Sequence, residues 1–111
     1  MQKAPKRFQK FTKQYPGVAS AYEKLGAECH AGGPLNEKER ALVKLGLSIG
    51  ARLEGAVHSH VRKALVAHVG HDEIFHVALL SLPTIGLPSM MAAMTWIDDV
   101  LSSSKTQFKK K

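Results

Sequence analysis

The stretch EGAVHSHVRKALVAHVGHDEIFHVALL, residues 54–80, decides the fold of this chain. Apolar side chains recur every three or four residues on both sides of Gly70, a spacing that is typical of amphipathic helices. The positions are Val57, Val61, Ala64 and Leu65 before the glycine, and Ile74, Val77, Ala78 and Leu82 after it. Gly70 suits the C-terminal cap of the first helix, and Asp72 and Glu73 suit the positive N-terminal turn of the second. The stretch therefore predicts two consecutive helices, from residue 54 or 55 to 68 and from 72 to 82.

The rest of the chain predicts three more helices. Pro16 suits the first turn of a helix that ends near Ala31, before Gly32, Gly33 and Pro34. Asn36 and Glu39 have the spacing of a capping box, which predicts a helix over residues 37–52. A methionine-rich segment predicts a last helix from Pro88 or Ser89 to about Ser103. No strand pattern and no internal repeat is present, so we expect an all-α domain of five to six helices.

The positive charge of the chain lies in its two ends. The formal net charge is +7, but residues 1–13 and 105–111 carry nine of the sixteen basic residues and no acid. Residues 14–104 keep seven bases against all nine acids and are therefore near −2. A nucleic-acid interface normally appears as a basic stripe on the folded body, so we expect no specific nucleic-acid partner. We interpret 1–13 as a basic, extended or frayed N-terminal arm, 14–104 as a single domain and 105–111 as a basic tail.

Cysteine content and hydropathy point to a cytoplasmic protein. Cys29 is the sole cysteine, so a disulfide within the chain and a Cys-x-x-Cys pair are both excluded. We expect it to be a buried or half-buried, inert thiol. The basic N-terminus lacks the apolar run of a signal peptide, and no segment approaches the roughly 18 apolar residues of a membrane span.

The segment from Ile74 to Met94 is more apolar than a monomer of 111 residues can bury. Pro83 and Pro88 divide it, which excludes a membrane helix. An apolar surplus of this kind usually covers a subunit interface. We therefore expect the chain to assemble with copies of itself.

Six histidines raise the question of a metal or acid/base site. None has the i, i+4 spacing of a helical zinc pair, so the sequence predicts no metal site. His68 and His71 are interpreted as helix-end residues. His60 falls on the apolar face of its helix, where charge is costly. It is either a hydrogen-bonded core histidine or an acid/base group facing a small apolar pocket, and in both cases we expect it to be mostly buried.

A polar ridge lies on the other side of the same helix. Glu54, His58 and Arg62 are each one turn apart and can interact in sequence. This ridge is either a surface row of weak ion pairs or a set of groups that face a substrate.

Residues 35–100 resemble the carboxymuconolactone decarboxylase family, which includes the alkylhydroperoxidase D-like proteins. The similarity is most specific in HVRKAL with His60, in HDEIFHV and in TIGLP. The resemblance implies an all-α fold built on a helical hairpin, assembled as a homotrimer or hexamer.

The peroxidase branch of that family carries Cys-x-x-Cys and, after three further residues, histidine. In that frame this chain has Leu53, Ala56 and His60, and it has Ala41 where the branch has a glutamate. Peroxide reduction through a thiolate needs a nucleophilic and a resolving thiol. We therefore do not expect peroxidase activity.

The decarboxylase branch has no cysteine requirement, and its chemistry needs an acid/base group and a cation that holds carboxylates. The resemblance suggests His60 for the first role and Arg62 for the second, with Glu54 and His58 as supporting or substrate-facing groups and no cofactor. Two hypotheses follow: a lyase that acts on a small carboxylated substrate, or an oligomeric binding or scaffold protein without catalysis.

Overall fold

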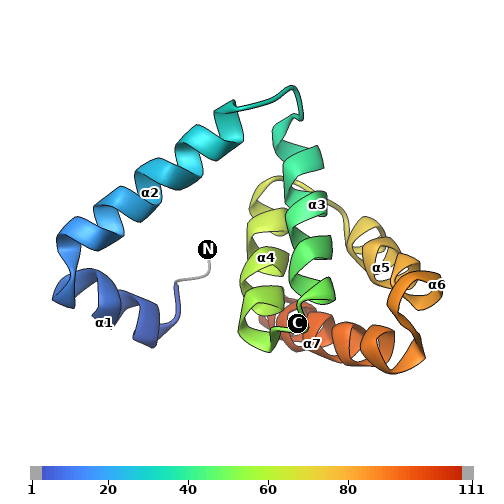
Figure 1. The fold of residues 1–111 in the computed structure, drawn as a ribbon. Coiled ribbons are helices and arrows are strands. Elements are labelled where there is room, and N and C mark those ends of the chain that lie inside the picture. The colour runs from blue at the N-terminus through green and yellow to red at the C-terminus, as the bar shows by residue number, and fades with distance from the viewer. Residues whose placement is uncertain (1–3, 109–111) are drawn as a thin grey trace. The chain divides into compact units, whose positions relative to one another are not determined.

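The computed structural model describes residues 4–108, with side chains from residue 4 to residue 103. All the regular structure in this range is helical, which confirms the all-α prediction (Figure 1). The chain divides into two compact units, Met1–Leu35 and Asn36–Lys111. The second unit contains every residue that was predicted to form a site.

The first unit begins with a helix where an extended arm was expected. Helix α1, Lys6–Gln14, starts after Pro5. The rings of Phe8 and Phe11, and those of Phe11 and Tyr15, have centroids 6.0 Å apart. This spacing of three and four residues is a helical signal, so residues 6–13 are helical and not the extended or frayed arm that was expected.

Helix α2, Pro16–Ala31, has the predicted bounds but buries no side chain. Val18, Tyr22 and Leu25, which form its apolar stripe, are all more than half exposed. Cys29 lies on the same helix and is exposed, which corrects the expectation of a buried or half-buried thiol. Cys29 therefore shares the exposure of the apolar stripe on the same helix.

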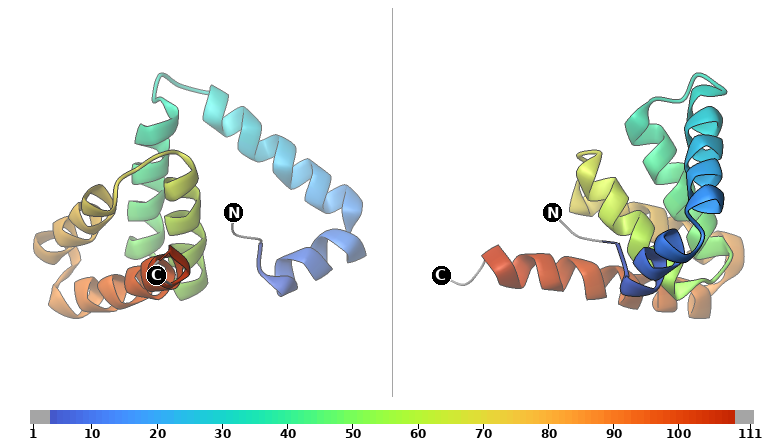
Figure 2. Two further views of the ribbon diagram at one scale, coloured as in Figure 1. Left: turned by 180° about the vertical axis from the view of Figure 1, so that it is seen from behind. Right: turned by 90° about the vertical axis from the view of Figure 1, so that its left-hand side faces the viewer.

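The second unit is a bundle of helices around one core. Its elements are α3 (Glu37–Gly50), α4 (Glu54–Val66), α5 (His71–Leu80), the short α6 (Leu82–Ile85) and α7 (Leu87–Phe108). Helices α3 and α4 lie side by side, and α7 packs against α4, α5 and α3 (Figures 1 and 2). The long α7 passes Ser103, where it was expected to end, so residues 105–108 are helical; residues 109–111 lie outside the described residues.

Helix ends in this unit follow capping chemistry. The Asn36 side chain accepts from the Glu39 N–H at 2.8 Å, and the Glu39 carboxylate accepts from the Asn36 N–H at 2.8 Å, which confirms the capping box. The residues that leave α3 and α4, Arg52 and His68, have left-handed φ values of 58° and 66°. Gly70 was expected to cap α4, but it caps the start of α5 instead, and its N–H donates to the Glu73 carboxylate.

The core of this unit lies between α3, α4, α5 and α7. The largest side chains that are fully buried come from all four helices. They are Leu45, Val57, Val61, Ile74 and Ile97. On α4 the buried positions are spaced by four and three residues, as the sequence predicted for an amphipathic helix.

The apolar surplus predicted between residues 74 and 94 remains largely on the surface. Six large apolar side chains of this segment are between 39% and 55% exposed. They are Leu79, Leu80, Leu82, Ile85, Leu87 and Met91. Within the described residues, no helix combines the length and the hydropathy that a membrane span requires.

Two leucines on one helix test the core. Leu45 is fully buried, whereas Leu47 is 67% exposed. We expect Leu45→Ala to lower the free energy of unfolding by about 2–5 kcal/mol, because it leaves a cavity. Leu47→Ala is the matched control and should change it by less than about 0.5 kcal/mol. Urea denaturation followed by circular dichroism measures both, and equal losses would contradict this description of the core.

Assembly can be tested at Met91, which is 53% exposed in the apolar segment. If copies of the chain cover this surface, Met91→Lys should dissociate the assembly, because an unpaired charge in an interface is costly. Thr95→Lys, one turn further along the exposed side of α7, is the control. Light scattering at micromolar concentration gives the mass. A wild-type protein with the mass of a 12.1 kDa monomer would refute the prediction.

Candidate functional site

His60 lies at the edge of the core rather than inside it. Its side chain is partly buried, so the expectation of a mostly buried ring was too strong. Partial burial lowers the pKa of His60 below its ordinary value of 6.5, and the positive charges of Lys63 and Lys44 lower it further. In the part of the chain that the structure describes, no hydrogen bond holds the ring. We expected a hydrogen bond to hold the second ring nitrogen of His60, but among the described residues of one copy no such bond is present. His60 is a neutral imidazole at pH 7 with ammonium groups nearby.

Two basic side chains, Lys63 and Lys44, place positive charge beside His60. Burial, then the charges of Lys44 and Arg62, lower the pKa of Lys63. Lys44 comes from α3, and His60, Arg62 and Lys63 come from α4. No acidic group contributes to the pKa of either His60 or Lys63. Basic groups that repel each other in this way favour the binding of an anion between them.

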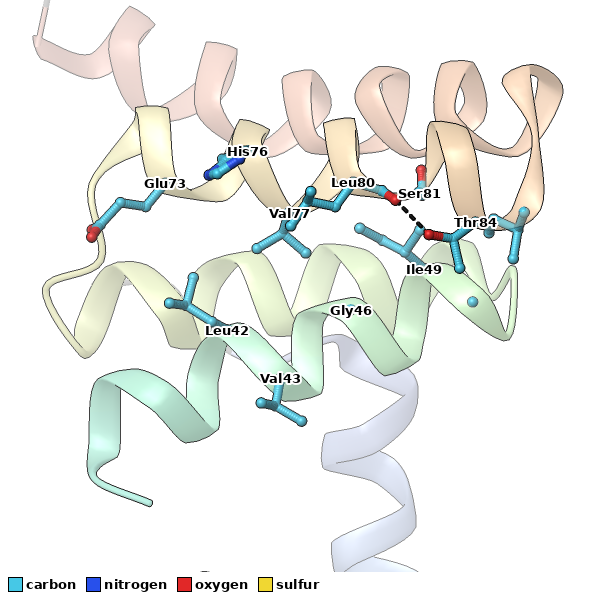
Figure 3. Close-up of a pocket in the computed structure, with 12 residues that line it drawn as sticks. Leu42, Val43, Gly46, Ile49, Glu73, His76, Val77, Leu80, Ser81 and Thr84 are labelled. Atoms are coloured by element: carbon cyan, nitrogen blue, oxygen red, sulfur yellow. Dashed lines mark hydrogen bonds between the residues drawn. The ribbon is translucent and has the colours of Figure 1, made fainter. Parts of the chain in front are cut away.

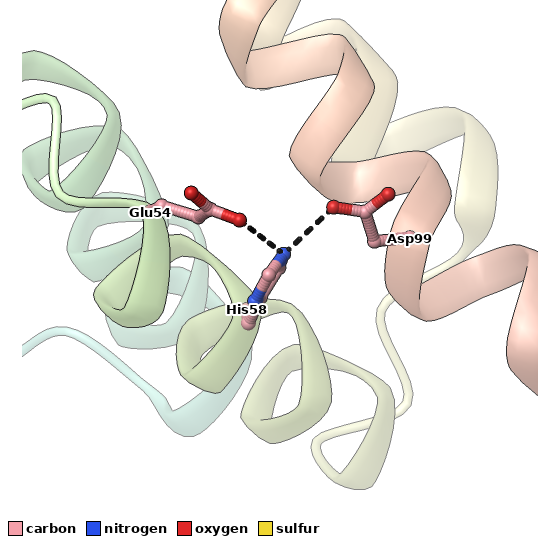
Figure 4. Close-up of side chains that lie close together, drawn as sticks. All are labelled: Glu54, His58 and Asp99. Atoms are coloured by element: carbon pink, nitrogen blue, oxygen red, sulfur yellow. Dashed lines mark hydrogen bonds and ion pairs between the residues drawn. The ribbon is translucent and has the colours of Figure 1, made fainter.

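The opposite side of α4 carries a separate polar cluster. His58 Nε2 lies 3.0 Å from Asp99 Oδ2 on α7 and 4.0 Å from Glu54 Oε2 on its own helix. Both carboxylates point at the same ring nitrogen (Figure 4). The imidazole is about one-quarter exposed, whereas both carboxylates are about half exposed. The cluster joins α4 to α7, and its three donor atoms all lie within 4.8 Å of one another, close enough to hold a metal ion.

An apolar groove lies between α3 and α5–α6, with a volume of about 520 Å³. Leu42, Ile49 and Val77 contribute to its walls (Figure 3). Its polar side chains include Glu73, whose pKa is lowered by the hydrogen bond from the Gly70 N–H and by Lys38. His60 does not line this groove. The expectation that His60 faces an apolar pocket is therefore not met by this cavity.

The structure brings together only part of the predicted site. Glu54 and His58 interact, as expected from their spacing, but Arg62 is not an ion-pair partner of either. Asp99 was missed because it lies 41 residues from His58. Lys44 was missed for the same kind of reason, since it approaches His60 from another helix. Lys63 could have been found, because it lies three residues from His60 and therefore on the same side of the helix.

The structure also shows the two positions at which the peroxidase branch carries cysteines. Leu53 precedes α4 and is 58% exposed, and Ala56 is partly buried on its first turn. The exposed Cys29 belongs to the other compact unit. The described residues thus place no sulfur in the frame that would support thiol-based peroxide reduction.

Comparison with known proteins identifies a family. The model of the "Carboxymuconolactone decarboxylase family" matches residues 16–99. A protein of Haemophilus influenzae described as uncharacterized is 36% identical over 59 residues. That similarity covers 53% of this chain and 52% of the relative, so the chain spans about half the length of the protein it matches. No solved structure matches the chain significantly.

The electrostatics of His60 can be tested by NMR titration of its ring. We expect Lys63→Gln to raise the pKa of His60, because it removes a nearby positive charge. Lys38→Gln should leave it unchanged, because Lys38 pairs with Glu73 and contributes nothing at His60. A His60 that titrates above 6.5 in the wild-type protein would contradict this description.

The same titration predicts a pH dependence of stability. Below pH 6.5 the unfolded chain takes up the His60 proton before the folded chain does. The contribution of His60 to stability is therefore fully present above pH 6.5 and decreases as the pH falls toward the folded pKa. A His60→Gln variant lacks this component, so its stability should fall less steeply than that of the wild type in this window.

Proposed function

The chain belongs to the carboxymuconolactone decarboxylase family, and from this membership we propose that it is a lyase of the decarboxylase type that acts on a small carboxylated molecule. His60 is the acid/base group in this proposal. Lys44 and Lys63 supply the positive charge that binds the substrate. The observation that carries the proposal is the combination of a partly buried imidazole, whose pKa is lowered, with the two ammonium groups of Lys63 and Lys44 that act on it.

The chemistry of decarboxylation explains why this combination is useful. When the bond to the carboxylate breaks, CO2 leaves and its electron pair stays on the substrate carbon. One proton must then reach that carbon. The protonated ring of His60 can donate it, and the neutral imidazole is then reprotonated by water, whose hydroxide combines with the released CO2 to give bicarbonate. Because the pKa of His60 is lowered, its protonated form is a stronger acid than an ordinary imidazolium and donates more readily.

The basic residues have two tasks in the same reaction. They attract the carboxylated substrate to the surface, and they stabilise the negative charge that develops on it as CO2 departs. Lys63 replaces Arg62 as the principal cation in this proposal, because its charge acts directly on His60. Arg62 contributes through its proximity to Lys63.

Glu54 and His58 act indirectly in this proposal. They lie with Asp99 on the other side of α4 from His60, so they hold the helix in place rather than touch the substrate. The apolar groove between α3 and α5–α6 is not assigned to the substrate, because a carboxylate would meet Glu73 there and no basic residue among the lining side chains except His76.

The test is release of CO2 from carboxymuconolactone and related carboxylated lactones by the full chain. We expect His60→Gln to lower kcat by about 100-fold or more while the fold is retained. Lys63→Gln should mainly raise KM, with His71→Gln, an exposed histidine on α5, as the control for both. The circular dichroism spectrum and the mass of each variant show whether it folds and assembles. Full turnover by a folded His60→Gln variant would exclude the acid/base role.

The second hypothesis, an oligomeric binding or scaffold protein, makes a different prediction for the same variants. If His60 has only a structural role, no carboxylated lactone is turned over by the wild-type protein, and His60→Ala lowers the melting temperature or prevents assembly.

A further inference from the structure

The cluster of Glu54, His58 and Asp99 has a donor set that the proposed lyase chemistry does not use. It combines the imidazole nitrogen of His58 with a carboxylate oxygen of Glu54 on the same helix and one of Asp99, which lies 41 residues after His58 on α7. Both carboxylates converge on Nε2 of His58 (Figure 4). Asp99 lies on α7, whereas Glu54 and His58 lie on α4. The cluster therefore differs from a row of surface ion pairs along one helix.

The charges at this cluster do not balance. His58 is the sole partner of each carboxylate in the ion pairs of the described residues, and neither carboxylate has a lysine or arginine within 4.0 Å. When the imidazole is neutral, two negative charges remain beside its lone pair. A proton on His58 compensates one of them, whereas a divalent cation compensates both. Two carboxylates beside one imidazole nitrogen thus match the charge of a divalent ion.

From this geometry we propose that Glu54, His58 and Asp99 bind a divalent transition-metal ion such as Zn²⁺, which clamps α4 to α7. Imidazole and carboxylate ligands suit such ions. Bonds of about 2.0–2.2 Å in a tetrahedral site place neighbouring donor atoms about 3.4 Å apart. The separations of 3.0 Å and 4.0 Å from His58 Nε2 lie on either side of this value, and all three donor atoms lie within 4.8 Å of one another.

The exposure of the three side chains indicates which of them are held in place and which can move. His58 is held in place by its partial burial, while the two carboxylates, at 58% and 49% exposed, can rotate onto an ion. Three protein ligands leave a fourth position for water. The ion lies on the opposite side of α4 from His60, so its effect is on the stability of the α4–α7 contact, and the lyase proposal does not depend on it.

Trp96 provides a probe that requires no activity. It is the sole tryptophan, and it lies one turn before Asp99 on α7, partly buried against the core. A paramagnetic ion bound at Asp99 should quench its fluorescence. The experiment is a titration of the untagged full chain with cobalt chloride, followed by tryptophan emission and by the visible absorption of bound Co²⁺.

We expect saturable quenching at one Co²⁺ per chain, reversed by a chelator, and displacement of Co²⁺ by Zn²⁺. His58→Ala and Asp99→Asn should weaken binding by about tenfold or more, since even supporting groups of a metal site contribute that much. The matched controls are Asp98→Asn, which alters the neighbouring exposed carboxylate, and His71→Ala, which removes a histidine outside the cluster. Both should bind as the wild type does.

A second measurement covers the case in which a variant folds poorly. Zn²⁺ should raise the melting temperature of the wild type and of Asp98→Asn, because it binds only the folded arrangement. It should not raise that of Glu54→Gln, which keeps His58 and Asp99 in contact. Binding that survives Asp99→Asn, or that Asp98→Asn weakens equally, would place the ion elsewhere and overturn the proposal. The absence of any saturable Co²⁺ or Zn²⁺ binding would do the same.

Discussion

The buried stripe of α4 constrains every other group on that helix. Val57, Val61 and Ala64 are fully buried, and together they fix the rotation of α4 about its axis. Successive residues of an α-helix are about 100° apart. Once the stripe points inward, His58 and His60 must therefore emerge on its two opposite sides, each at the border between the core and solvent.

The two neighbours of α4 then give these histidines different surroundings. On one side α3 brings Lys44 toward His60, and on the other side α7 brings Asp99 to His58. One imidazole is therefore surrounded by positive charge and the other by negative charge, although they are two residues apart. Burial and cations both favour the neutral form of His60. The carboxylates beside His58 favour a bound cation instead.

The sequence predicts well whatever depends on neighbours within one or two turns. The α2 bounds, the Asn36–Glu39 capping box and the buried stripe of α4 all follow from local spacing. The aromatic spacing of Phe8, Phe11 and Tyr15 carried the same kind of information, but the basic charge of that segment obscured it. Gly70 is ambiguous in sequence, because glycine suits both the end of one helix and the start of the next. The structure resolves this ambiguity by giving His68, not Gly70, the left-handed conformation.

Contacts between helices could not be predicted in this way, and both candidate sites depend on them. Spacing along α4 identified Glu54, His58 and His60, but not the groups from α3 and α7 that determine their chemistry. The family resemblance suggested Arg62 as the cation, although helical geometry brings Lys63 closer to the side of His60. Spacing along a single helix can thus identify candidate reactive side chains. The helices packed against it determine the charge around each of them. In this protein the packing of α4 between α3 and α7 gives two histidines in one turn of the same helix surroundings of opposite charge.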